Sequence, residues 1–379
     1  MKLNVGILGI GNAGGQIAYL AKKTADIPAI AVNVSEDDNE TLKGVVTTLG
    51  IGNAMGSGKN RDRAKTFAKN QIRSLIANEA FDSFIRESQV VFVVYSTGGG
   101  TGSAIGPMMT AILKSHYKDQ DESARIRFIN IGILPQLSEA LQAQENTIAA
   151  IRELASYDSV FTFYDNERYS NCPVNEMMDK VNHDVVEDIK VIRGDYNILS
   201  KYDQIDSQDM LNVISFDGFY RIASAVGFQE KDLESEGIEE KLIKNLSTSS
   251  GCEIERDRSC VCMAPIVNIR PGIANAFNPA LPKMHELFGK APVAFQHYYV
   301  IENDEKDFPN RVHVIMTGMS IPDDRLAKVV QCIEEFKQAM TTTRKQSSVL
   351  SSYGETQNLV KDANVAKESQ SIDDLLSKF

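Results

Sequence analysis

The sequence predicts an α/β protein in which a mainly parallel sheet, covered by helices on both faces, precedes a long helix and a second, smaller α+β domain. Three observations support this fold class. Short apolar runs alternate with helical segments over the first 165 residues, glycine-rich loops directly follow two of those runs, and a later group of strand-like runs ends in a helix. A length of 379 residues is enough for two or three domains, each with its own core.

Five apolar runs in the first part of the chain are the expected strands, at residues 3–8, 29–34, 90–95, 126–134 and 159–164. The segments between them have helical character, at 14–23, 62–84, 104–117 and 139–154. Ligands of such parallel sheets bind at the carboxyl ends of the strands. The loops at those ends are therefore where a binding site is expected.

The second part of the chain is expected to begin with one long, partly buried helix at 175–193. Apolar residues recur there at helical spacing, at Met178, Val181, Val185, Ile189 and Ile192. Helices are then expected at 210–226 and 234–246, strands at 259–268, 293–302 and 311–320, and a closing helix at 323–340. These elements divide the chain into five parts, 1–174, 175–193, 194–258, 259–340 and 341–379.

The last of these parts, 341–379, is rich in Ser, Thr, Gln, Asn and Lys, which predicts a mobile or only partly helical tail. Its final nine residues, SIDDLLSKF, regain an apolar stripe. They read either as a frayed end or as a peptide that folds on a partner.

Composition and charge narrow the possible classes of protein. No apolar run approaches the roughly 20 residues that span a bilayer, and the first strand-like run lacks the cleavage site of a signal peptide, so a cytoplasmic location without direct membrane contact is expected. A formal charge of −11 argues against broad nucleic-acid binding by the chain itself, although it leaves DNA contact through a basic partner open. The five cysteines and five histidines have no metal-site spacing.

Two glycine-rich loops carry the functional prediction. GIGNAGGQ at 9–16 follows the first expected strand and matches G-x-G-x-x-G, the dinucleotide-binding fingerprint, which is a weak signal when it stands alone. GGGTGS at 98–103 follows another strand, and a third glycine-rich stretch, 50–60, has Lys59 and Arg61 close to its end. Glycine lets backbone N–H groups approach a phosphate, and the helix that follows offers unpaired amides. Two such loops on one sheet predict a nucleoside di- or triphosphate, although no Walker-type G-x-x-x-x-G-K-[ST] occurs.

An NAD-dependent Rossmann oxidoreductase is the less favoured alternative. It would explain the first loop and the acidic segment 33–38 after the second strand, where a ribose-binding carboxylate is expected. It does not explain GGGTGS behind a third strand, and it leaves no clear catalytic His, Lys or Tyr.

GGGTGS after an apolar strand, together with GIGNAGG, resembles the tubulin/FtsZ superfamily of polymerising GTPases, whose signature is G-G-G-T-G-S/T-G; Ala104 stands here in place of the last glycine. The resemblance implies a GTP-binding domain at 1–174, a central helix, a catalytic loop within 194–258 and a C-terminal domain at 259–340. It also implies GTP or GDP as ligand, with Mg²⁺ held mainly by phosphates and water. The implied inner-phosphate loop is Gly11, Asn12, Ala13, Gly14 and Gln16, and the main phosphate clamp is Gly98, Gly99, Gly100, Thr101, Gly102 and Ser103.

The same resemblance implies the rest of the binding residues. The γ-phosphate loop would be Gly56, Ser57, Gly58 and Lys59, and Asn33 and Glu139 are further candidate contacts. Asn166 would read guanine through its amide. Either Asn175 or Asp179 on the central helix would be the second guanine-reading residue, and the sequence does not choose between them.

The catalytic candidates are Gln204, Asp206 and Asp209, because family members carry N-x-D-x-x-D in the loop after the central helix and this chain has QIDSQD. The two carboxylates are also well suited to cap a helix, and a competing placement of the loop is Gly194-Asp195-Tyr196-Asn197. In this family, the acidic pair completes the nucleotide site of a second subunit that stacks head to tail. The resemblance thus implies a filament in which assembly triggers hydrolysis.

Within the family, the chain looks most like the TubZ type of plasmid and phage DNA-partition proteins of bacteria, whose treadmilling filaments engage a DNA-bound adaptor protein. A division protein of the FtsZ type, with a tail that binds membrane anchors, is the alternative. A polymer that binds GTP but hydrolyses it poorly is a third possibility, against which the intact loops and acidic pair argue.

Overall fold

The computed structural model describes residues 2–52, 56–118, 125–201, 204–235, 237–254, 259–276, 280–301 and 308–350. The chain forms two compact units, residues 1–329 and 330–379, and the second is described only as far as residue 350. The end of the tail, including SIDDLLSKF, lies outside the described residues.

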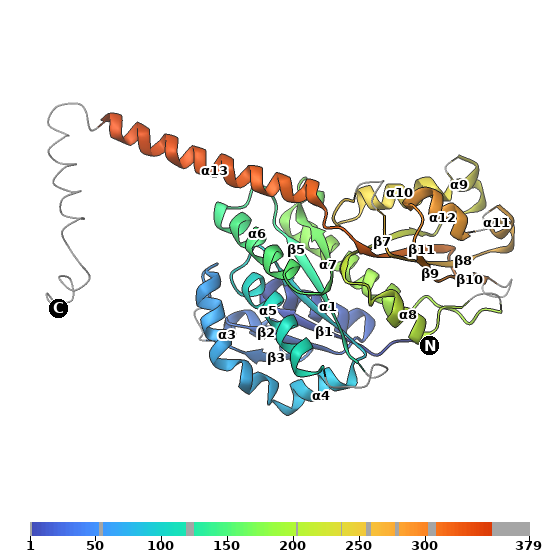
Figure 1. Cartoon of the computed structure of the whole chain (residues 1–379), viewed down its shortest axis with the longest axis horizontal. Coiled ribbons are helices and arrows are strands. Elements are labelled where there is room, and N and C mark those ends of the chain that lie inside the picture. Colours follow the sequence, from blue (N-terminus) through green and yellow to red (C-terminus); the bar gives the residue numbers. More distant parts are fainter. Residues whose placement is uncertain are drawn as a thin grey trace. The chain divides into compact units, whose positions relative to one another are not determined.

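A single hydrogen-bonded sheet runs through the first unit (Figure 1). Its strands lie in the order β10-β8-β11-β7-β6-β5-β4-β1-β2-β3, and β9 pairs with β8. The strands from β3 to β7 are parallel, whereas β11 runs antiparallel to both β7 and β8. This is the α/β architecture that the alternating pattern predicts, with a smaller mixed part at one end of the sheet.

Before β7, the parallel part contains six strands among the described residues: β1 (Val5–Ile10), β2 (Ala29–Asn33), β3 (Thr47–Gly50), β4 (Val90–Ser96), β5 (Arg127–Leu134) and β6 (Val160–Asp165). All five strands expected there are confirmed, and β3 is an additional strand that was not expected. Its helices are α1 (Gly11–Ala25), α2 (Glu36–Glu40), α3 (Arg61–Ile76), α4 (Glu79–Glu87), α5 (Thr101–His116) and α6 (Leu141–Ala155). The central strands read as continuous apolar runs because helices cover both of their faces.

The core is divided by the sheet. On one face, buried residues of α1 and the long helix α7 (Val174–Arg193) pack against alternate positions of β1, β4 and β5. On the other face, α3, α4 and α5 pack against the intervening positions of the same strands. Side chains in a strand alternate between faces, so each strand serves both halves of the core and fixes its register.

The smaller part of the sheet joins the parallel part through β6 and β7, which pair at Val160–Gly218 and Phe161–Phe219. Its strands are β7 (Gly218–Val226), β8 (Cys262–Ile269), β9 (Val293–Ala294), β10 (His297–Val300) and β11 (Arg311–Met319). The associated helices are η2 (Asn166–Tyr169), α8 (Ser207–Val213), α9 (Glu230–Ser235), α10 (Ile238–Thr248), α11 (Pro271–Ala276), α12 (Ala280–Phe288) and α13 (Asp323–Leu350).

One expected helix is wrong: within 210–226, α8 ends at Val213 and residues 218–226 form strand β7. The run FYRIASAV is buried almost throughout because β7 lies between β6 and β11. A strand buried on both faces cannot be distinguished from a buried helix by periodicity alone, although its aromatic and β-branched residues favour a strand.

Four smaller expectations are corrected. The helix expected at 62–84 is two helices, because the Asn78 side chain accepts a hydrogen bond from Phe81 N at 3.1 Å and starts α4. The stretch 293–302 contains two short strands, β9 and β10, rather than one. Helix α13 continues past residue 340 to Leu350. On α7, Met177 is buried and Met178 is 50% exposed, so Met178 does not belong to the apolar stripe.

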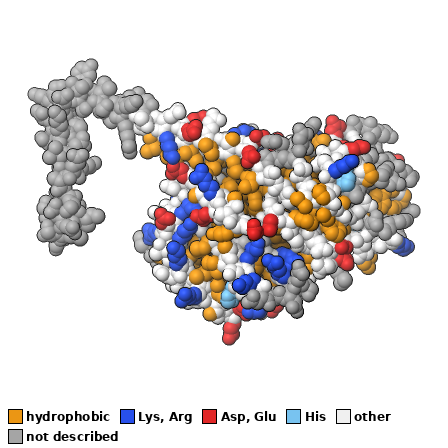
Figure 2. Space-filling model, viewed as in Figure 1, with side chains coloured by type: hydrophobic (Ala, Val, Ile, Leu, Met, Phe, Trp, Pro, Cys, Tyr) orange, Lys and Arg blue, Asp and Glu red, His pale blue; other side chains and the backbone are white. Residues whose placement is uncertain are grey.

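The surface drawn in Figure 2 carries Lys and Arg side chains interspersed with Asp and Glu over the first unit. In the part of the chain that the structure describes, no helix combines the length and the hydropathy required to cross a bilayer.

Candidate nucleotide-binding site

A cavity of about 500 Å³ opens at the carboxyl ends of the parallel strands. It is formed by the loops that follow β1, β2, β4 and β5, by the segment 56–59 that precedes α3, and by one residue of α7. The predicted binding residues that line it are Gly11, Asn12, Ala13, Asn33, Gly56, Ser57, Gly58, Lys59, Gly98, Gly99, Gly100, Thr101, Gly102 and Glu139. Residues far apart in the sequence thus meet where such folds bind ligands.

The first and second glycine loops touch each other. Gly11 has φ +71°, a left-handed conformation that favours glycine, and a Cβ there would lie 3.2 Å from Gly102 N. Helices α1 and α5 both begin in these loops, and neither has a side chain hydrogen-bonded as its N-terminal cap. First-turn amides of two helices are therefore free to bind an anion at one place.

The third loop packs against the second. A Cβ on Gly100 would lie 2.8 Å from the Cα of Lys59, so only glycine allows this approach. Ser57 Oγ and Thr101 Oγ1 are 3.2 Å apart and share a hydrogen bond between the loops. Lys59 Nζ lies 3.7 Å from Glu139 Oε2, with both side chains partly exposed. The cavity therefore has hydroxyl groups and one cation close to its glycine backbone.

Three predicted binding residues do not line the cavity but support its walls. Gly14 packs against the carbonyl of Val94 in the neighbouring strand. Gln16 Nε2 donates to Thr41 Oγ1 at 3.2 Å. The buried Ser103 hydroxyl donates to the Gly99 carbonyl within its own loop.

The candidates for reading a base lie apart from the residues that line the cavity. Asn166 is the first residue of η2, directly after β6, and is partly exposed. Asn175 and Asp179 are exposed on the first turns of α7. Between them, Met178 lines the cavity, which brings this face of α7 to the site.

Sequence reasoning did not assign Ser35, Asp38 or Met178 to this site, although all three line the cavity. Asp38 Oδ2 accepts from Asn33 Nδ2 at 3.0 Å, and Ser35 caps α2 by accepting from Asp38 N at 3.4 Å. The available signal was Ser-x-x-Asp directly after a buried strand, a helix-start pattern. In the sequence, the same segment also fits the ribose-binding carboxylate of a dehydrogenase.

Asp206 and Asp209 form a reciprocal cap at the start of α8. Asp206 Oδ1 accepts from Asp209 N at 2.8 Å, and Asp209 Oδ2 accepts from Asp206 N at 3.2 Å. Just beyond α8, Ser215 Oγ accepts from Nε of Arg127, the first residue of β5, at 3.0 Å. The capping function expected of the pair is thus present, and its helix lies toward the amino ends of the strands, opposite the glycine loops.

Residues 194–197, the alternative position for the catalytic loop, make contacts that stabilise the fold. Gly194 ends α7 with φ +84°, and the adjacent Asp195 pairs with Arg193 Nε at 2.6 Å and with Lys2 at 3.2 Å. Burial alone would raise the pKa of Asp195, but the hydrogen bonds and charge of Arg193 hold it below its usual value. Gln204 and Asp206, by contrast, are exposed.

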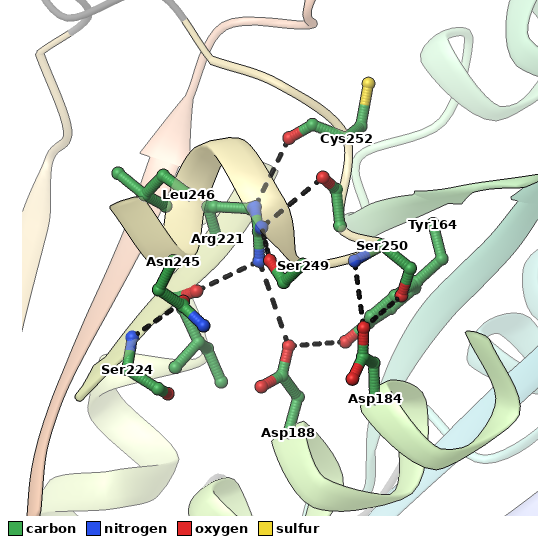
Figure 3. Close-up of polar contacts among 12 residues, drawn as sticks. Tyr164, Asp184, Asp188, Arg221, Ser224, Asn245, Leu246, Ser249, Ser250 and Cys252 are labelled. Atoms are coloured by element: carbon green, nitrogen blue, oxygen red, sulfur yellow. Dashed lines mark hydrogen bonds and ion pairs between the residues drawn. The ribbon is translucent and has the colours of Figure 1, made fainter. Parts of the chain in front are cut away.

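A second polar cluster connects α7 with β7 and the segment after α10 (Figure 3). Asp188 Oδ2 accepts from Tyr164 OH at 2.6 Å and lies 4.0 Å from Arg221 Nη1. Asp184 Oδ2 accepts from both N and Oγ of Ser250, at 2.8 and 2.7 Å. This cluster borders a separate cavity of about 240 Å³ and fixes the central helix against the smaller part of the sheet.

Comparison with known proteins gives the family of the domain that contains the second and third loops. Residues 52–172 match the profile described as "Tubulin/FtsZ family, GTPase domain". The tubulin-like protein CetZ of Pyrococcus abyssi is 26% identical over 243 residues, which are 60% of this chain and 62% of that protein. The tubulin-like protein TubZ of Clostridium botulinum C phage is 28% identical over 185 residues, 46% of this chain and 49% of that protein. These matches span less than two thirds of either relative.

Among solved structures, the helical model of the TubZ-Bt two-stranded filament superposes with a TM-score of 0.73 at 15% identity and covers 93% of each chain. At that identity, the likeness concerns the fold. The resemblance predicted from GGGTGS and GIGNAGG is confirmed: residues 52–172 match the tubulin/FtsZ-family GTPase domain, and the chain has the fold of the superposed TubZ structure.

Proposed function

We propose that the cavity binds GTP and that the chain hydrolyses it to GDP and phosphate when copies stack head to tail into a filament. The family of the domain supports a GTPase over the NAD-dependent oxidoreductase. The three loops also fit a triphosphate better than a dinucleotide, because amides of two helix starts, two hydroxyl groups and Lys59 converge on one cavity.

The fit to the ligand rests on backbone groups. Close glycine packing leaves no Cβ between the backbones of the loops around Gly11 and Gly100, and a phosphate chain can approach their N–H groups. In this proposal Thr101 and Ser57 donate hydroxyl hydrogen bonds to phosphate oxygens, and Lys59 offsets charge at the terminal phosphate. Asn166, with Asn175 or Asp179, would recognise guanine.

Magnesium also fits, with few protein ligands. Asp38 and Glu139 are carboxylates on the cavity wall, and the described residues contain no cluster of three or more metal-ligating side chains. Mg²⁺ bound there would offset the negative charge of the phosphates, with Asp38 and Glu139 as the carboxylates of the wall that could hold it or its water ligands.

One observation carries the filament proposal: the acidic pair and the glycine loops lie at opposite ends of the same parallel sheet. Asp206 and Asp209 therefore cannot act on the nucleotide of their own chain. In a stacked copy, they would orient a water molecule for attack on the terminal phosphate. Such a head-to-tail contact does not close on itself and builds filaments, and the superposed TubZ-Bt structure is titled as a filament.

The test is the GTPase rate per chain as a function of protein concentration. The rate per chain should be low in dilute solution and rise above a critical concentration, at which filaments appear by electron microscopy with GTP. A rate per chain that stays constant down to nanomolar protein would exclude assembly-coupled hydrolysis.

A role in moving plasmid or phage DNA through a DNA-bound adaptor is a finer proposal, favoured by the similarity to a phage TubZ. Full-length filaments should retain a small DNA-binding protein from extracts of the host, and filaments of chains ending at Leu350 should not. Retention of a membrane-anchoring protein instead would support the division role.

A further inference from the structure

Two side chains outside the glycine loops hold the second and third loops together. Asn146 lies on α6 and is 1% exposed, and Arg61 is the first residue of α3. We call this pair the loop clamp. Neither residue lines the nucleotide cavity itself, so their contacts act on it only through the loops.

Asn146 binds three backbone carbonyls from the two loops. Its Nδ2 donates to the carbonyl oxygens of Lys59 at 3.0 Å, Gly98 at 3.1 Å and Gly99 at 3.3 Å. Its Oδ1 accepts from Gln142 Nε2 at 3.0 Å, a contact that does not involve either loop.

These contacts set the direction of the backbone in the second loop. In a trans peptide, the C=O of one residue and the N–H of the next point in opposite directions. Because the Gly98 and Gly99 carbonyls are directed at Asn146, the N–H groups of Gly99 and Gly100 point away from it. Gly99 and Gly100 line the nucleotide cavity, whereas Asn146 does not. Their N–H groups are therefore oriented to donate to phosphate oxygens in that cavity.

Arg61 fills a hydrogen-bonding position that proline leaves empty. In α5, the helical partner of the Ser103 carbonyl would be the N–H of residue 107, which is proline and has none. Arg61 Nη1 donates to the Ser103 carbonyl at 2.8 Å and to the Asn146 carbonyl at 3.1 Å. Its Nη2 pairs with Glu153 at 2.8 Å, so the guanidinium spans α3, α5 and α6.

The segment between these anchors is strained and carries the third loop's functional groups. Lys59 has φ +60°, a left-handed conformation that costs a residue with a Cβ roughly 1–2 kcal/mol. Such a conformation persists only where surrounding contacts enforce it. Its carbonyl is held by Asn146, and Asn60 N donates to the Ser57 carbonyl at 3.1 Å.

We propose that Asn146 and Arg61 are positioning residues for the terminal phosphate: they hold Ser57 and Lys59 where a nucleoside triphosphate, but not a diphosphate, reaches them. This inference rests on the proposed binding of GTP. Loss of the clamp releases the third loop, whereas the first loop, which holds the inner phosphates, remains packed against β4 through Gly14.

The test is the ratio of affinities of dilute, full-length protein for a slowly hydrolysed GTP analogue and for GDP, measured by equilibrium titration with fluorescently labelled nucleotides. Asn146→Asp has the same shape but turns an oxygen toward the three carbonyls. It should reduce the preference for the triphosphate by about tenfold, or about 1.4 kcal/mol of binding free energy.

Two control variants separate this effect from general loss of structure. Gln142→Ala removes the bond to Asn146 Oδ1 but leaves all three loop contacts. Thr110→Val removes a buried hydrogen bond to Asn130 at 2.8 Å, away from both loops. Both should keep the wild-type preference, and circular dichroism checks that every variant is folded.

Arg61→Lys provides a second, independent variant should Asn146→Asp fail to fold. Lysine keeps the charge but cannot span Ser103, Asn146 and Glu153, so the triphosphate preference should again fall. The positioning role of the clamp would be overturned if the folded variants lost equal affinity for the GTP analogue and for GDP. It would also be overturned if they kept the wild-type preference for the triphosphate. Wild-type protein that binds no guanine nucleotide would instead overturn the proposed function.

Discussion

The guanidinium of Arg325 binds both carboxylate oxygens of Asp165, with Nε 2.6 Å from Oδ2 and Nη2 2.9 Å from Oδ1. Arg325 lies in the first turn of α13, and Asp165 is the last residue of β6. Arg325 Nη2 also donates to the Pro135 carbonyl at 2.8 Å, and Asp165 Oδ1 accepts from Glu167 N at 3.1 Å. The start of α13 is thereby tied to the turn that presents Asn166 at the glycine-loop edge of the sheet.

Replacing Arg325 with alanine should therefore destabilise the first unit strongly. Both side chains of the pair are 6% exposed, and removing one partner of a buried pair typically costs about 3–5 kcal/mol. Urea denaturation followed by circular dichroism measures the change. Lys328→Ala, at an exposed position of the same helix, should change the free energy of unfolding by less than about 0.5 kcal/mol. A loss of under about 1 kcal/mol in Arg325→Ala would mean that the pair contributes little net stability.

Asp206→Asn should abolish assembly-coupled GTP hydrolysis without weakening the helix. Asparagine caps a helix about as well as aspartate, so the hydrogen bond to Asp209 N is retained while the charge that would orient water is lost. Filaments should still form with GTP and should persist longer, as measured by light scattering together with phosphate release. Asp206→Ala should show the same kinetic defect and, in addition, lose about 1 kcal/mol of stability with its cap. Wild-type hydrolysis by filaments of Asp206→Asn would remove this residue from the catalytic role.

The parallel part of the fold could be predicted because its strands are apolar runs separated by helices with clear start signals. Strand β3 (Thr47–Gly50) could not be predicted from its sequence, TTLG, because it lacks an apolar run. It lies at the edge of the sheet and is partly exposed. For strand β7 the sequence predicts a helix, because burial on both faces removes the alternation that identifies a strand. In both cases the neighbouring strands, and not the local sequence, determine the structure.

The candidate site was predictable where glycines mark a close approach of backbones, and not where side chains converge from distant elements. GGGTGS and GIGNAGG, taken together, indicate phosphate loops. Asn146 and Arg61 have no such signature. The side chain of each contacts a loop carbonyl that lies more than 40 residues away in the sequence. The helical spacing predicts Met178 in the core, whereas its neighbour Met177 is the buried residue.

Thr101→Ala should slow hydrolysis and only modestly weaken binding of GTP. The Thr101 hydroxyl forms a hydrogen bond with the Ser57 hydroxyl of the third loop and is also available to a phosphate oxygen. The backbone amides of the second loop are unchanged in the variant, so most of the binding should remain. A rate reduction of about tenfold corresponds to about 1.4 kcal/mol of transition-state stabilisation. Thr101→Ser keeps the hydroxyl and should retain most of the rate. Turnover is measured as phosphate release above the critical concentration, and unchanged turnover in Thr101→Ala would exclude the hydroxyl from the site.

The stability of the fold should carry a pH dependence that originates at Asp188. Burial raises the pKa of Asp188 to about 7, against the opposing effects of the Arg221 charge and the hydrogen bond from Tyr164. In the unfolded chain, an aspartate has a pKa of about 3.9. Between these values, the folded protein holds a proton that the unfolded chain has lost. The free energy of unfolding that this group contributes therefore falls as pH rises from about 4 to about 7, by at most about 1.4 kcal/mol per pH unit.

Asp188→Asn removes this contribution. The difference in free energy of unfolding between the variant and the wild type isolates it, because the other titrating groups are present in both proteins. His313, whose pKa burial lowers to about 3, adds a slope of the opposite sign to each and cancels in the difference. The variant should accordingly gain stability relative to wild type as pH is raised from 5 to 7.5, as measured by urea denaturation at each pH. Asp158→Asn, at an exposed position, should show no such trend. A constant difference between Asp188→Asn and wild type across this range would mean that Asp188 is already ionised in the folded protein at pH 5, held so by Arg221.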